Sequence, residues 1–540
     1  MAMATPSGGS GLLTLSNELL RDILDHIEAD PEKLVSLDRR AYLSQESFKP
    51  PPAPAPDQAQ DIGYFRLVCK RFSELGALHQ FARVTTRFSR DGFRRLDKIA
   101  GQPHLAKHVK KFSYMVPYFY VEGRHTPELH VQSNDDVPGR ERVRELLPDL
   151  QDSLGSLDVR YFIRKIDEQK EIVRSEEDAR VLKKALSAFT SLQHVQILRV
   201  QDQADGVLLS YIRQHDDLSQ LVELKWAPAC SHSTRTIGAA LLASRSPCSR
   251  FSSPMLSPQS AIVLAEHPPK SFSTLAERLT CLELHFDDGT DLDIKMRELS
   301  GLFKTVFTAA KNMQAVHVGF PSHRPLSLRL EEVFHHVRWE KLLAFGIQGW
   351  KLDAEEIVAL ADRHRERLKG LRLRDVLLKE GSMWKDVLGH LRDNMMRLDW
   401  VSLRRIGYEK HFDEQWAVAG AEVPDDPPGG ASESEDESDG DFEHHTDNGD
   451  FHDRSEGSSA FTDSDEERES DDEHGPAAHE INFPVLRPDT PSSIPWCNCD
   501  GRSYPDSADD LGDDGILVSN LQRKMWERWV VRRCPEHCQR

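Results

Sequence analysis

The pattern that recurs most often along this chain is a triplet of apolar residues spaced apolar-x-x-apolar-x-apolar. The last two positions of a triplet share one face of a strand, and short apolar runs of this kind predict buried strands. The first residues of seven triplets follow one another at intervals of 29, 58, 34, 29, 26 and 27 residues. These are Leu192/Val195/Ile197, Leu221/Leu224/Trp226, Leu279/Leu282/Leu284, Met313/Val316/Val318, Leu342/Phe345/Ile347, Leu368/Leu371/Leu373 and Met395/Leu398/Trp400, and Val109/Phe112/Tyr114 precedes them.

Helices are predicted between these strands. The segments that begin at Ser175, Asp353 and Ser382 each carry apolar residues at the three- and four-residue spacing of an amphipathic helix. In the second segment Glu356 stands where a capping box would place it. The predicted buried positions are Val181, Leu182, Ala185, Leu186 and Phe189; Ile357, Leu360, Ala361 and Leu368; and Trp384, Val387, Leu388 and Leu391.

A strand followed by a helix, repeated at this interval, resembles the leucine-rich repeat, whose period is roughly 20–29 residues. The interval of 58 residues is twice 29, as though one unit near residue 250 is degenerate. The asparagine that follows the strand in regular repeats is absent, and residues 120–170 and 230–270 are irregular. We therefore expect an α/β fold in which residues 81–418 form a degenerate, leucine-rich-repeat-like curved array whose concave face binds a target. The alternative is an ordinary α/β domain in which the triplets recur by chance.

A second apolar pattern lies near the N-terminus, in two pieces. The first piece, within residues 12–30, predicts a helix with an apolar stripe, and the second piece, residues 65–72, predicts another short one. Two short helices this apolar cannot bury themselves, so they need a partner surface. The predicted contact residues are Leu15, Leu19, Leu20, Ile23, Ile27, Leu67, Val68 and Phe72.

The two pieces, "LSNELLRDIL" and "FRLVCKRF", resemble the F-box of fungal-type F-box proteins. This module docks a protein on the Skp-type adaptor of a cullin–RING ubiquitin ligase, so the resemblance implies an adaptor-binding head over residues 12–80. Ser16 replaces the usual proline, and a proline-rich insertion at 31–61 separates the halves more than is usual in the family. We expect that insertion to be a solvated, extended loop, because its proline run suits such a conformation.

The net charge of −20 comes from one part of the chain. Residues 421–480 contain 23 acidic and two basic residues and contribute −21, so the remainder sums to about +1. So few apolar residues cannot offset the entropy of ordering, and we expect disorder over 419–482, as we do over 1–11. The segment is either a solubilising linker or a site for phosphorylation or a basic partner.

The C-terminal segment, 483–540, combines a predicted helix with paired cysteines. The helix places Leu517, Leu521, Met525 and Trp529 at steps of four, and we expect it to fold back on the body as a small cap. Paired thiolates can supply a tetrahedral zinc site, and the candidate ligands are Cys497, Cys499, Cys534 and Cys538. The Cys-x-Cys spacing of the first pair is tighter than is usual in such sites. We expect no metal and no other cofactor; the alternative for these cysteines is a reduced patch or one disulfide.

Neither a secretory signal nor an apolar run of membrane-spanning length is present, and the eight cysteines suit a reducing compartment, so the predicted location is cytoplasmic and/or nuclear, without membrane contact. We found no catalytic or phosphate-binding motif and no clear nucleic-acid signature. The hypothesis is a non-enzymatic substrate adaptor of an SCF ubiquitin ligase, with a Skp-type adaptor, a cullin scaffold and an unknown target protein as partners. The alternatives are a non-ligase scaffold and, less favoured, an enzyme without a recognisable catalytic set.

Overall fold

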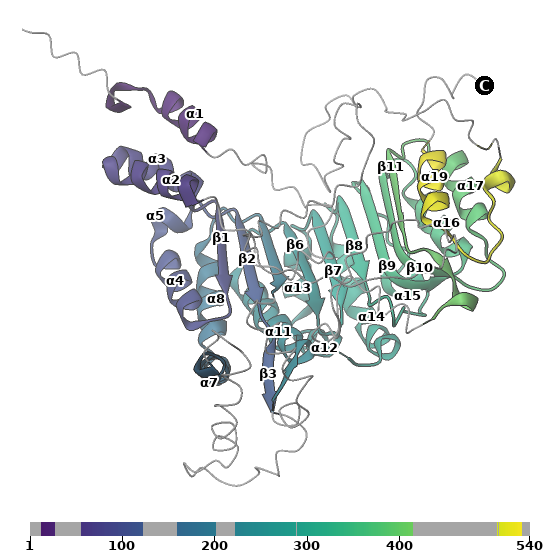
Figure 1. Ribbon diagram of the computed structural model, residues 1–540, viewed down its shortest axis with the longest axis horizontal. Coiled ribbons are helices and arrows are strands. Elements are labelled where there is room, and N and C mark those ends of the chain that lie inside the picture. The colour runs from purple at the N-terminus through teal and green to yellow at the C-terminus, as the bar shows by residue number, and fades with distance from the viewer. Residues whose placement is uncertain are drawn as a thin grey trace, which may run out of the picture. The chain divides into compact units, whose positions relative to one another are not determined.

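The computed structural model describes residues 12–27, 56–122, 159–200, 222–287, 289–413, 505 and 507–531. Over these residues the chain is an α/β protein with a parallel sheet of ten strands (Figure 1). Nine strands lie in the order β1-β2-β4-β6-β7-β8-β9-β10-β11, and every neighbouring pair is parallel. Their bounds are Arg83–Arg87, Lys111–Val116, His194–Arg199, Arg250–Leu256, Cys281–Phe286, Ala315–Gly319, Ala344–Leu352, Gly370–Leu378 and Trp400–Arg404, and β12 (Gly407–Tyr408) pairs with the end of β10.

The helices fall into three groups along the chain. Three helices, α1–α3, precede the sheet, and α19 (Asn520–Val530) follows it. The first three are α1 (Asn17–Ile27), α2 (Pro56–Val68) and α3 (Lys70–Gln80). Those between strands are α4 (Arg90–Ala100), α5 (Pro103–Ala106), α7 (Val159–Ser175), α8 (Glu177–Ala188), α11 (Trp226–Ser244), α12 (Pro258–Leu264), α13 (Pro269–Ala276), α14 (Leu292–Ala309), α15 (Leu330–Phe334), α16 (Ala354–Arg363) and α17 (Trp384–Asn394).

Six of the seven strands predicted from the regularly spaced triplets lie in the parallel sheet. The seventh prediction, at residue 221, was wrong, because β5 (Val222–Lys225) pairs antiparallel with β3 (Phe119–Glu122) in a separate two-stranded sheet. Two apolar residues of this triplet, Leu224 in β5 and Trp226 at the start of α11, are nevertheless buried. The triplet therefore indicated burial correctly, but burial does not determine which strand is the partner.

The strand that occupies the position between β4 and β7 is β6, in the degenerate unit near residue 250. Its sequence, "RFSSPML", interrupts the apolar alternation with serines and a proline, which concealed it. The last predicted strand was also displaced. β11 begins at Trp400, and its residues in the apolar core are Val401 and Leu403.

The predicted helices agree with the structure. Glu356 acts as its capping-box position predicts, since its carboxylate accepts from the backbone N–H of Asp353 at 3.2 Å, while its own N–H donates to the backbone carbonyl of Asp353 at 3.0 Å. The predicted apolar residues of α8, α16 and α17 are buried, although two of them, Phe189 and Leu368, lie after the ends of α8 and α16. The helices pack on one face of the sheet, where alternate strand residues such as Val316 and Val318 share a core with Phe303 and Phe307 of α14. Helix packing on alternate strand positions leaves the intervening side chains on the other face.

Three adjacent strands kink at the same register position. Gly349, Asp375 and Arg405 follow the aligned residues of β9, β10 and β11, and all three have positive φ, at 66°, 49° and 46°. At Gly349 a Cβ would lie 2.3 Å from the carbonyl oxygen of Phe320, so only glycine fits there. Arg405 donates to both carboxylate oxygens of Asp375, at 2.6 and 3.0 Å, which joins two of the kinks.

The described C-terminal residues pack on the last strand and the last body helix. Trp526 is fully buried and its indole donates to the carbonyl of Leu511 at 3.0 Å. Arg523 donates to the carbonyl oxygen of Leu403 at 2.6 Å, and the Glu527 carboxylate accepts from the backbone N–H of Leu403. These side chains satisfy the backbone N–H and carbonyl of Leu403 on the edge strand β11. Unpaired backbone groups on an edge strand would otherwise allow another strand to add to the sheet.

The predicted stripe of the C-terminal helix needs correction. The helix begins at Asn520 behind a Ser519 N-cap, so Leu517 lies before it, and Leu517 and Leu521 are 76% and 75% exposed. Trp529 is buried as predicted, and the other buried residues of the helix are Trp526 and Val530, each one position after a predicted stripe position. The Ser519 side chain accepts from the backbone N–H of Gln522 and fixes the start of the helix at Asn520, which leaves Leu517 outside it.

Several predicted segments fall outside the described residues. These are residues 1–11, the acidic segment over 419–482, and the cysteines Cys497, Cys499, Cys534 and Cys538. Most of the insertion at 31–61 is also outside. The end of the insertion was predicted wrongly, because α2 already begins at Pro56. Proline is tolerated at the first helical position, since an N–H there would have no partner within the helix.

Candidate functional site

The two N-terminal apolar pieces meet in space, and α1–α3 with the residues just before α1 form a unit that we call the head. Arg71 of α3 joins them. Its guanidinium donates to the backbone carbonyls of Leu13 and Leu15, at 3.2 and 2.6 Å, and to the side-chain oxygen of Asn17 at 2.7 Å. Charge-assisted bonds to three acceptors hold the start of α1 against α3, although more than fifty residues separate them in sequence.

The head has an apolar core of its own, separate from the cores of the sheet. Leu20 and Leu24 of α1 meet Ile62 and Phe65 of α2 there, and the core is completed by Phe72 and Leu75. The rings of Phe65 and Phe72 stack with centroids 4.4 Å apart. This core explains why the spacing of the two pieces in sequence matters little, since a loop lengthens at small entropic cost when the packing is kept.

Other apolar side chains of the head point away from this core. Leu67 is 82% exposed, Val68 58% and Leu19 51%. With Leu12, Leu13 and Tyr64 they are six of the thirteen large exposed apolar side chains found among the described residues. Because exposed apolar side chains are concentrated on so small a unit, and such side chains favour contact with another protein, we treat this head surface as the first candidate site.

The residues predicted to contact a partner thus divide between two roles. Leu19, Leu67 and Val68 lie on the surface, whereas Leu20 and Phe72 have no exposed area and hold the head together. Leu15 and Ile23 are half-buried, and Ile27 ends α1, with its side chain outside the described residues. The periodicity of α1 could not distinguish its inner from its outer leucines, because both sets follow helical spacing. Arg71, which fixes the geometry, was not predicted at all.

The second candidate site is the face of the parallel sheet opposite the helices, which we call the polar face. Its middle row runs across six adjacent strands in register, as Ser252, Glu283, His317, Gly346, Arg372 and Ser402. Gly346 gives the His317 ring its space, because a Cβ there would lie 2.2 Å from Nδ1. The central side chains of this row are buried.

Basic residues dominate the polar face. Among the described strand positions on this face that precede the kink at Gly349, Asp375 and Arg405, Glu283 is the one acidic residue, against the seven basic residues Arg83, Arg87, Lys111, Arg250, Arg372, Arg374 and Arg404. Arg83 at one end and Arg404 at the other are exposed, while Arg250 and Arg372 in the middle are buried. The face therefore suits a partner that carries negative charge.

Two histidines of this face are neutral at physiological pH. Burial lowers the pKa of His317 well below its ordinary value, and the charges of Arg372 and Arg374 lower it further. Burial and the neighbouring Lys111 and Arg250 do the same to the pKa of His194, whose Nε2 lies 2.8 Å from the Ser252 hydroxyl. These two histidines therefore add no positive charge to the face at physiological pH.

Within the described ranges, no group of three or more histidine, cysteine or acidic side chains is arranged to hold a metal ion. The four zinc candidates lie outside those ranges. No helix of the described residues is long and apolar enough to cross a membrane.

A scan against protein-family models and a search of curated proteins both return no match for this chain.

Proposed function

We propose that this chain is a substrate adaptor whose head docks on the Skp-type subunit of an SCF ubiquitin ligase and whose body captures a target protein for ubiquitination. The observation that carries the proposal is the exposed apolar surface of the head around Leu67, on a unit with its own core. An apolar surface on a separately packed unit suits docking on another protein, and the motif residues Phe65, Arg71 and Phe72 maintain that unit.

The body is proposed to be a degenerate leucine-rich-repeat-like array that holds the target on its polar face. Sequential parallel strands with helices on one side, and the kink repeated at Gly349, Asp375 and Arg405, support this interpretation. The excess of arginine and lysine on the polar face favours a target segment rich in acidic groups. In this mechanism ubiquitin transfer belongs to other subunits, and this chain contributes position, because holding the target near the conjugating enzyme raises its effective concentration.

Co-purification tests the proposal. The full chain, a Leu67→Asp variant and a Leu521→Asp control are expressed with an affinity tag, and the adaptor and cullin that copurify are quantified. Leu521 is a matched control because it is 75% exposed, against 82% for Leu67, but lies on α19 rather than on the head. The wild type and the control should recover both subunits, and Leu67→Asp should lose both.

The outcomes separate the alternatives. Recovery of the adaptor without a cullin would indicate a non-ligase scaffold. Equal recovery of the adaptor by all three forms would contradict the proposal that the head surface around Leu67 binds it. For the target, Arg404→Glu should reduce the set of proteins that accumulate on the chain under proteasome inhibition. Arg365→Glu, an exposed charge reversal just after α16 and off the polar face, should leave that set unchanged.

A further inference from the structure

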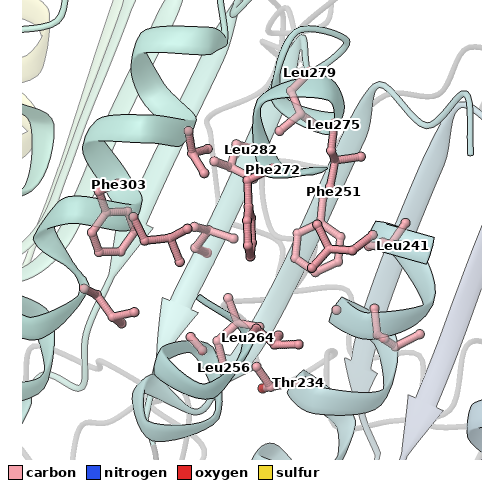
Figure 2. Close-up of a pocket in the computed structure, with 18 of the residues that line it drawn as sticks. Thr234, Leu241, Phe251, Leu256, Leu264, Phe272, Leu275, Leu279, Leu282 and Phe303 are labelled. Carbon is pink, nitrogen blue, oxygen red and sulfur yellow. The ribbon is translucent and has the colours of Figure 1, made fainter. Parts of the chain in front are cut away.

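A cavity of about 170 Å³ lies between the sheet and the helices in the degenerate unit of the body. It is bounded by β6 and β7 on the sheet side and by α11, α12, α13 and α14 on the helix side. Figure 2 shows side chains from several of these elements around one space, among them Leu241, Phe251, Leu264, Phe272, Leu275 and Phe303. Protein interiors hold few voids larger than a water molecule, so a cavity of this size is unusual.

The sequence explains why the helix layer is thin at this point. The connections on either side use long helices, the 19-residue α11 and the 18-residue α14. Between β6 and β7 the chain instead forms α12 and α13, of 7 and 8 residues, separated at Pro268 and Pro269. Proline removes a helical N–H and disfavours helix in the residue before it, so one continuous helix cannot form. Two short helices supply fewer side chains to the space than one long helix would.

The helices around the cavity are also held in place. At Gly238 of α11 a Cβ would lie 2.3 Å from Cδ1 of Leu264, so the glycine allows α12 to approach closely. The cavity also lies where the two cores of the body meet, since Phe251 packs against both. Closing the cavity by moving α12 or α13 would disturb both cores, and the space is therefore a built part of the fold.

The wall is almost entirely hydrocarbon. The Oγ1 of Thr234 accepts a hydrogen bond from the backbone N–H of Ser257, at 3.0 Å. The thiol of Cys248 donates to the carbonyl of Arg250, at 3.0 Å, and burial raises the pKa of this thiol to about 11, so it carries no charge. A ligand would find no charged partner in the wall, and a buried polar group without a partner is costly.

The volume limits the size of the ligand. A cavity of about 150 Å³ lined by leucine, isoleucine and phenylalanine stays dry and binds benzene, whereas drug-sized ligands need about 300 Å³ or more. We propose that this cavity is a binding site for a compact, uncharged apolar molecule of about six to ten non-hydrogen atoms, of the alkylbenzene class. The inference does not depend on the proposed function, because no residue of the head or of the polar face lines the space.

The test is calorimetric titration of the full chain with toluene and, separately, with phenol. Toluene should bind, and phenol should bind at least about tenfold more weakly, because its hydroxyl would lose its bonds to water. Absence of toluene binding, or equal binding of the two probes, would overturn the proposal.

Variants locate the site. Val306→Phe fills the cavity from α14 and should weaken toluene binding at least about tenfold. Val263→Phe is the matched control, because Val263 lies on α12 but is 44% exposed and does not line the cavity. If Val306→Phe lowers the melting temperature of the chain, Leu302→Phe, which also fills the cavity from α14, replaces it as the filling variant. Unchanged toluene affinity in a folded filling variant would place the binding elsewhere and contradict the assignment.

Discussion

His364 should make the stability of this protein depend on pH between about pH 4 and 6.5. The residue is the C-cap that follows α16, and it is 4% exposed. Its Nδ1 lies 3.0 Å from the carbonyl oxygen of Leu360, and its Nε2 lies 3.2 Å from the backbone N–H of Trp339, whose ring stacks on the imidazole. These contacts suit the neutral ring, in which Nδ1–H donates and Nε2 accepts. Protonation would add a hydrogen to Nε2, which would then face the backbone N–H of Trp339 and could no longer accept its hydrogen bond.

The magnitude follows from the pKa. Burial, with smaller effects from Arg363 and Arg338, lowers the pKa of His364 from 6.5 to about 4. Below pH 6.5 the unfolded chain binds a proton that the folded chain does not, so stability falls as the pH falls and stops falling near pH 4. At about 1.4 kcal/mol for each tenfold difference in proton affinity, the full effect is about 3 kcal/mol. By pH 4.5 about 2.5 kcal/mol of it should be lost.

The assay is urea unfolding followed by circular dichroism at pH 7.0 and pH 4.5. Other groups also titrate in this range, so the informative quantity is the difference between variants. His364→Gln should reduce the loss of unfolding free energy between the two pH values by about 2 kcal/mol relative to the wild type. His104→Gln, at an exposed histidine of α5, should behave as the wild type does. If His364→Gln loses as much stability as the wild type, the neutral, buried state of His364 is refuted.

Three further substitutions test how the elements are held. Leu20→Ala should destabilise the head by about 3 kcal/mol, whereas Leu19→Ala should cost less than about 0.5 kcal/mol, as measured by amide exchange in α1–α3. Arg405→Ala leaves the buried carboxylate of Asp375 without its bidentate partner, and the midpoint of urea unfolding should report a loss of about 3 kcal/mol. Trp526→Ala should cost about 3–5 kcal/mol and release α19, which protease cleavage near residue 520 would detect.

The apolar spacing of the chain predicted strands well where each unit is regular. Phe345 and Ile347, or Leu371 and Leu373, point into the core as their spacing requires, because a strand buried on one face must alternate. The same rule failed where burial had another source. Leu224 is buried within a two-stranded antiparallel sheet, and β6 carries Ser253 where its neighbour β7 has Leu284. The spacing of apolar residues does not indicate which strand is the pairing partner, and it does not detect a strand that is rich in polar residues.

The candidate sites show a similar division. The head was predicted from its motif, but the motif mixes residues of two functions, since Phe72 supports the core and Leu67 faces outward. The row of charges on the polar face was not predicted, because its members lie on separate strands and meet only through the register of the sheet. The cavity depends on the break at Pro268 and Pro269, which sequence alone marks as an irregular segment without indicating what surrounds it.

The most direct test of the proposed function is the affinity of the purified full chain for a purified Skp-type adaptor, measured by calorimetry for the wild type, Leu67→Asp and Leu521→Asp. The account predicts a one-to-one complex for the wild type and the control, and binding at least about a hundredfold weaker for Leu67→Asp, because a carboxylate would lose its water in an apolar interface without a partner. Circular dichroism should show all three forms equally folded, since both leucines are exposed. Absence of a complex with the wild type, or equal affinity of all three forms, would contradict the central claim that the head surface docks this chain on the ligase.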